Sequence, residues 1–135
     1  MRNHSRGQSL VEFALLLPVF VLFVVVIFDL GRAIYYYSAI YNAAREGARF
    51  GAVQPSDTTG MRTRAVNYAI GLGMTLTDVT AGAGPVQVID GFPNPTVRVQ
   101  VVYTFQPVTP LVDRLLPGGQ LTLRSEAVMR TEVIP

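Results

Sequence analysis

Few side chains in this sequence could take part in catalysis. The 135 residues include no cysteine, and the one histidine, His4, lies close to the N-terminus. Nucleophilic catalysis needs a nucleophile beside a base, and the neighbours Ser125 and Glu126 have no histidine to complete such a group. The sequence therefore predicts a protein that is not an enzyme, binds no cofactor and takes no small-molecule substrate.

Metal, phosphate and nucleic-acid sites are not indicated either. Gly82 and Gly84 lack the basic residue and the motif of a phosphate-binding loop. The formal charge of +2 comes from scattered arginines, without lysine, whereas nucleic-acid binding requires a stripe or cluster of positive charge. Four aspartates are isolated and fit no calcium-loop spacing: Asp57, Asp78, Asp90 and Asp113.

One carboxylate is in an unusual place, because Glu12 is the only charge between Leu10 and Phe28. A charge costs about 2.5 to 3.5 kcal/mol at the centre of a membrane helix and less near its end, so Glu12 needs a partner or a function. The alternative is that Glu12 extends to the cytoplasmic headgroups. In the same stretch, Pro18 removes one backbone donor and predicts a kink or a loosened turn.

The apolar stretch is long enough to cross a bilayer once. As a helix, residues 10–28 would be about 28 Å long, close to the ~30 Å thickness of the hydrocarbon core. Arg2 and Arg6 precede the stretch, which favours a cytoplasmic N-terminus and an outward-facing C-terminus. Tyr35 to Tyr37 are then expected in the far interface as an aromatic belt. The sequence predicts a single-pass protein of the cytoplasmic membrane, in contact with the lipid bilayer.

A secretory signal peptide is the competing interpretation of the same stretch. It requires small residues at a cleavage site after the apolar run. The segment Val26 to Asp29 offers none, and Gly31 to Ala33 lacks the A-x-A pattern. The sequence therefore favours an anchor that is retained.

The segment RGQSLVEFALLLP resembles the processing site of type IV pilin-like proteins, where a membrane aspartic peptidase cuts after a glycine on the cytoplasmic side of the helix. The resemblance implies that a prepilin peptidase cuts between Gly7 and Gln8 and that Glu12 becomes the fifth mature residue. It also implies that Phe13 and Pro18 belong to the processing and assembly segment. Gln8 replaces the phenylalanine that is usual at the first mature position, which favours a particular branch, the TadE-like family.

Two further motifs, DLGRAIYY and NAAREGARFGA, follow in the order typical of TadE-like proteins, which are minor pseudopilins of tight adherence (Tad) pili. The resemblance covers Arg6 to about Ala52. It implies a pilin-like structural subunit, assembled into or at the base or tip of a Tad pilus that serves adhesion or secretion. Its partners would be other pilin-like subunits and the pilus assembly platform. The signature residues are Asn42, Ala44, Arg45, Glu46, Gly47 and Arg49.

The resemblance also implies a partner for Glu12. In a filament, the carboxylate could pair with the free amino terminus of an adjacent subunit and so fix axial register, even if the pair adds no net stability. The alternative function is a single-pass membrane adaptor whose outer head binds a pilus or secretion machine without entering a filament. Gly7 to Glu12 discriminates between the two, because a simple anchor needs no processing.

After Asp29 the pattern is amphipathic, and it predicts one continuous helix from Ser9 to about Phe50. Small side chains from Ala43 to Ala48 permit close packing, and Glu46 is placed for a local ion pair with a neighbouring arginine. The predicted apolar face consists of Leu30, Ala33, Ile34, Tyr37, Ile40, Tyr41, Ala44 and Ala48. The predicted opposite face consists of Arg32, Ser38, Asn42, Arg45 and Arg49.

The rest of the chain predicts a small sheet with one more helix. Ser56 or Asp57 would cap a helix over residues 61–72. A glycine-rich joint at residues 82–85, a short strand at 86–89 and a turn at 90–95 are expected next. Residues 96–106 and 121–133 alternate between apolar and polar, as half-buried strands do. The proline-rich segment 107–119 between them is expected to be a short helix or apolar loop that caps the sheet, or a surface for a partner.

These elements predict an α+β fold of pilin-like layout, in which a long N-terminal helix packs on a small antiparallel sheet. The expected organisation is a leader at residues 1–7, a transmembrane helix at 8–29, an exported helical half at 30–52 and an α+β head at 53–135.

Overall fold

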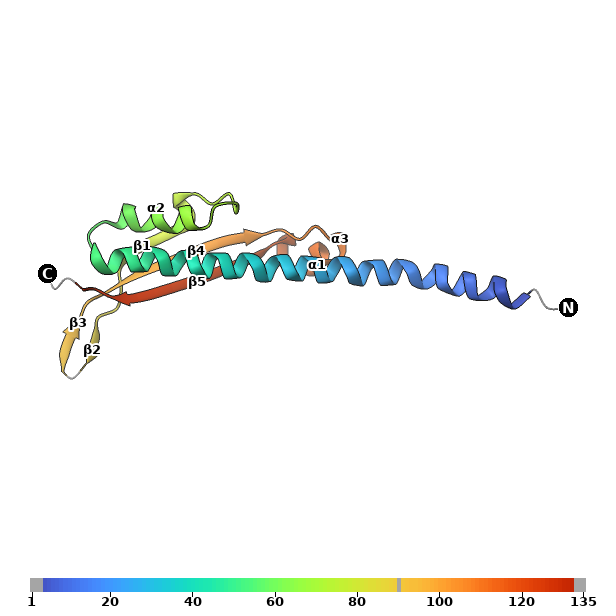
Figure 1. The fold of residues 1–135 in the computed structure, drawn as a ribbon, viewed down its shortest axis with the longest axis horizontal. Helices are drawn as coiled ribbons and strands as arrows, with labels where there is room; N and C mark the ends of the chain where they lie inside the picture. The colour runs from blue at the N-terminus through green and yellow to red at the C-terminus, as the bar shows by residue number, and fades with distance from the viewer. Residues whose placement is uncertain (1–3, 90, 133–135) are drawn as a thin grey trace.

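A long helix dominates the computed structural model, which describes residues 4–89 and 91–132 (Figure 1). Helix α1 runs from His4 to Val53 without interruption, so at 1.5 Å per residue it is about 75 Å long. It exceeds the predicted helix by about one turn at each end, and Pro18 does not interrupt it. Arg2, Asp90 and Val133, which the sequence analysis used, lie outside the described residues.

The C-terminal half of α1 packs on a three-stranded antiparallel sheet with the order β1-β4-β5 (Figure 1). Strand β1 spans Val79–Ala83, β4 spans Thr96–Phe105 and β5 spans Leu121–Arg130. The register places Val99 opposite both Ala81 and Ala127. The predicted α+β architecture is confirmed, as are the two alternating strands β4 and β5.

Small side chains bring α1 close to the sheet. The core contains Ile40 and alanines of α1, two residues of helix α2 (Thr58–Tyr68), and the inward valines of the strands. A Cβ atom at Gly47 would lie 2.9 Å from the carbonyl oxygen of Met61 and 3.1 Å from Cγ1 of Val99. The predicted close approach is therefore confirmed.

The predicted apolar face of α1 was partly wrong, because four of its members are exposed: Leu30, Ile34, Tyr37 and Tyr41. The sheet instead contacts the face that carries Ile40, Ala43, Ala44, Gly47 and Ala48. Larger side chains on this face would hold the two layers apart, so the bulky residues point away from the core.

Helix α2 spans Thr58–Tyr68, and the side chain of its N-cap residue Asp57 accepts a hydrogen bond from the amide of Gly60 at 2.8 Å. The helix begins earlier and ends earlier than predicted. After it, Gly71 and Gly73 have φ angles of 98° and 65°, a region that glycine adopts readily and other residues seldom do. The chain therefore leaves the helix before residue 72.

Two predictions between α2 and β4 were wrong. The joint expected around Gly82 is instead the end of strand β1, which follows the short 3-10 helix η1 at Leu76–Asp78. The turn expected at residues 90–95 contains strand β3, Phe92–Asn94, which pairs with β2, Gln87–Ile89. This hairpin projects from the end of the head that is opposite the N-terminus (Figure 1).

The segment between β4 and β5 forms a short helix, one of the two forms predicted for it. Helix α3 spans Pro110–Leu115 and is followed by the 3-10 helix η2, Pro117–Gly119. It lies beside α1 at the end of the head that faces the N-terminal half of the long helix (Figure 1). Strand β5 then returns along the length of the head.

Candidate membrane anchor and assembly site

The N-terminal half of α1 is apolar and uncovered. An 18-residue window of this helix has a mean hydropathy of 3.0, and none of that window is buried. Large apolar side chains from Leu10 to Phe28 are exposed around the helix. This one helix is long and apolar enough to cross a membrane, as the sequence predicts.

The residues of the predicted processing segment all lie in the first turns of this uncovered helix. Gly7, Gln8, Glu12, Phe13 and Pro18 are exposed. Within the described residues, Glu12 has no hydrogen bond and no ion pair, and a Cβ atom at Gly7 would meet nothing within 4 Å. The fold of the single chain thus leaves these side chains open to other molecules.

Asp29, at the end of the apolar run, holds the head against α1. Its carboxylate is 5% exposed and accepts hydrogen bonds from the amides of Val108 at 3.1 Å and Thr109 at 2.8 Å. The hydroxyl of Thr109 donates a further bond, and Nη1 of Arg32 lies 3.1 Å from the same carboxylate. We call these residues the Asp29 clamp: Asp29, Arg32, Val108 and Thr109. The clamp was not predicted from the sequence, although an acidic residue at the end of an apolar run is an unusual feature.

An aromatic cluster continues the contact one turn beyond the clamp. The ring of Tyr36 lies 5.3 Å from that of Tyr103 and 5.7 Å from that of Phe105, both edge to face. The guanidinium of Arg32 stands 5.4 Å from the Phe105 ring. Burial raises the pKa of the Tyr103 phenol above its ordinary value, and Tyr36 raises it further. Tyr36 therefore belongs to the head contact, while Tyr35 and Tyr37 are exposed.

The signature residues divide into packing residues and surface residues. Ala44 and Gly47 are buried against α2 and the sheet, so their small size has a packing reason. Arg49 pairs with Glu46 at 3.2 Å on the surface, which confirms the predicted local pair. Arg45 stacks over the ring of Tyr41 at 5.7 Å, and Asn42 is exposed.

Replacing Gly47 with valine is expected to destabilise the head by about 1–3 kcal/mol, because overpacking forces backbone shifts. For a domain of this size each kcal/mol lowers the melting temperature by roughly 4–8 °C. Thermal unfolding of the full chain in detergent micelles would measure the change. The matched control is Gly31→Val on the same helix, where a Cβ atom meets nothing within 4 Å. Equal melting temperatures for the two variants would contradict the packing argument.

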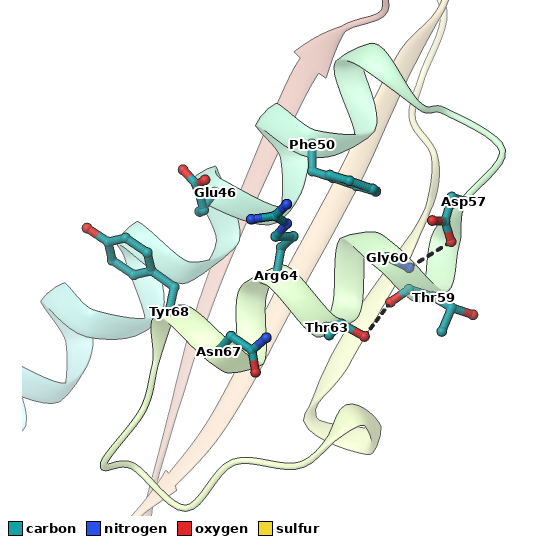
Figure 2. A pocket seen from close by; sticks show the side chains of 9 residues that line it. All are labelled: Glu46, Phe50, Asp57, Thr59, Gly60, Thr63, Arg64, Asn67 and Tyr68. Carbon is teal, nitrogen blue, oxygen red and sulfur yellow. Dashed lines mark hydrogen bonds between the residues drawn. The ribbon is translucent and has the colours of Figure 1, made fainter.

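A hollow of about 600 Å³ lies between α1 and α2 (Figure 2). Its acids are already engaged, since Asp57 caps α2 and Glu46 pairs with Arg49. The guanidinium of Arg64 lies 5.5 Å from the ring of Phe50. Among the described residues, no group of three or more histidine, cysteine, aspartate or glutamate side chains could hold a metal ion. The hollow thus brings together no convergent reactive groups.

A comparison with known families matches the N-terminal part of the chain. Residues 7–49 match the family model described as TadE-like protein, the family that the motifs resembled. The TadE-like family is a structural family associated with Tad pili. No curated protein and no solved structure matches the chain. The matched residues comprise the uncovered helix, the clamp residue Asp29 and every signature residue.

Proposed function

We propose that this chain, which is TadE-like over residues 7–49, is a pilin-like structural subunit of a Tad pilus. A prepilin peptidase cuts it between Gly7 and Gln8, and the mature subunit enters the pilus or caps its base or tip. The match to the family model carries this proposal, because it begins at Gly7 and runs through the whole apolar helix. The partners are other pilin-like subunits and the assembly platform.

In this function the chain has one orientation in the membrane and consists of four parts. The leader, residues 1–7, stays in the cytoplasm, since Arg2 and Arg6 precede the apolar run. Residues 8–29 cross the membrane, residues 30–52 continue outward as helix, and residues 53–135 form the head. The exposed apolar side chains of the helix and the absence of other long apolar stretches in the sequence support this arrangement.

A stripe on the exported half of α1 supports contact with a neighbouring helix. Leu30, Ile34, Tyr37 and Tyr41 are exposed although they lie beyond the apolar run. Their spacing of four, three and four residues has the 3.5-residue period of a helix–helix seam. Isolated apolar residues on a surface are ordinary, whereas a continuous row marks an interaction surface.

The decisive test is the intact mass and N-terminal sequence of the protein recovered from membranes and from sheared surface filaments. A subunit of the pilus is expected to begin at Gln8 and to be present in filaments. An uncleaved chain confined to membranes would contradict the proposal and favour a membrane adaptor. The control is Gly7→Leu, which removes the glycine of the cut site at an exposed position and should leave the chain uncleaved.

A further inference from the structure

The segment that follows β4 runs beside the apolar part of α1. An open hollow of about 450 Å³ is lined by Thr109 together with residues from Leu17 to Val25. A second hollow of about 190 Å³ is lined by Val112 and Leu116 on one side and by Val26 and Leu30 on the other. At 1.5 Å per residue, Val25 lies about 6 Å from Asp29 toward the N-terminus. The segment therefore lies beside a part of α1 that is still apolar.

The surface of this segment combines apolar and charged side chains. Val108 is 71% exposed, and Val112 and Leu116 are half-buried against α1. Phe28 of the long helix is also exposed at this level. Asp113 and Arg114 are exposed on the same short helix, a mixture of charged and apolar residues that is typical of elements in a membrane interface.

Several backbone donors of the segment are satisfied within the protein. The amides of Val108 and Thr109 donate to Asp29, and Pro107 and Pro110 have no N–H to satisfy. Further on, the amide of Asp113 donates to the carbonyl of Thr109 at 3.0 Å, and that of Leu116 to Val112 at 3.2 Å. An unsatisfied backbone group costs several kcal/mol in lipid. The clamp thus lowers the cost of placing this loop against lipid, because it satisfies two of the loop's amides.

From these observations we infer that residues 107–116 form a second membrane contact, which lies in the outer interface of the bilayer beside the spanning helix. The occupant of this surface is phospholipid, because its apolar side chains are continuous with the apolar run of α1 and its charged residues, Asp113 and Arg114, suit the headgroup region. The Asp29 clamp fixes the depth of the contact. The head is therefore seated on the bilayer and not held away from it on a free stalk.

Tryptophan fluorescence can test this contact, because the chain contains no tryptophan of its own. Val108→Trp would be placed in the full chain in phospholipid nanodiscs, with and without bromine on the upper acyl chain. The expected result is an emission shifted to shorter wavelength and quenched by the brominated lipid, close to the behaviour of Phe28→Trp. Both positions are exposed, so neither substitution disturbs the core.

The matched control is Val88→Trp in the β2–β3 hairpin, which is 70% exposed and lies at the far end of the head (Figure 1). It should emit as in water and show no quenching by bromine. Val108→Trp emission that resembles this control and not Phe28→Trp would overturn the inference. Adding Asp29→Ala to Val108→Trp should abolish the quenching, and persistent quenching would refute the role of the clamp. These measurements require neither cleavage nor filaments, so their failure is distinct from failure of the proposed function.

Discussion

Replacing Asp29 with alanine is expected to detach the end of the head that lies next to the apolar run from α1. The substitution leaves the amide and the hydroxyl of Thr109 without their acceptor in a buried position, and the amide of Val108 in a part-buried one. Unsatisfied buried donors cost about 1–3 kcal/mol each, and more when the lost partner is charged. The freed donors will partly move to bond with water, which lowers their combined cost. We therefore expect a loss of about 2–4 kcal/mol in the free energy of unfolding. That is a large fraction of the stability of a small domain.

Thermal unfolding in micelles and amide hydrogen exchange would measure this loss, with faster exchange expected at Val108 and Thr109. The matched control is Glu46→Ala on the same helix. Glu46, like Asp29, pairs with an arginine three residues later, but that pair is on the surface and is expected to contribute less than about 1 kcal/mol. If the two alanine variants were equally stable, the clamp would not hold the head in place.

Replacing Glu12 with alanine is expected to leave membrane insertion intact and to abolish co-assembly with other subunits. Glu12 is exposed and makes no ion pair within the described part of the chain, so its loss removes nothing that stabilises the single subunit. Insertion should become easier, because a charge in an apolar helix is costly. In the proposed filament, however, the amino terminus of a neighbouring subunit would lose its partner, and a stranded buried charge costs about 3–5 kcal/mol.

Membrane fractionation and the amount of subunit in sheared filaments would separate these two effects. Leu16→Ala is the matched control, since Leu16 is exposed one turn further along the same helix and carries no charge. Glu12→Gln tests the charge at constant size and should assemble as poorly as the alanine variant. Normal incorporation of Glu12→Ala into filaments would refute the proposed pairing.

Local sequence patterns were sufficient to predict the elements that follow one regular hydrophobic period along their length. The apolar run and the helical period after it determine the long helix α1, and strict alternation from Thr96 and from Leu121 determines β4 and β5. The motifs in this part of the chain were also sufficient to recognise the TadE-like family, whose model matches residues 7–49. Strand β1 was missed because its Val-Thr-Ala-Gly-Ala sequence contains a glycine typical of turns. Strand β3 was missed because proline in a three-residue strand is atypical.

Residues close together in the chain were therefore enough to predict a helix long and apolar enough to cross a membrane, the resemblance to TadE-like proteins and two strands of a small sheet. The tertiary structure alone decided which face of α1 meets the sheet, because only the partner layer requires glycine at 47 and leaves Ile34 and Tyr37 outside. It also decided that Asp29 joins Thr109, eighty residues away. No local period encodes such a contact, because it forms only when strand β4 runs back along the helix to the end of the apolar run.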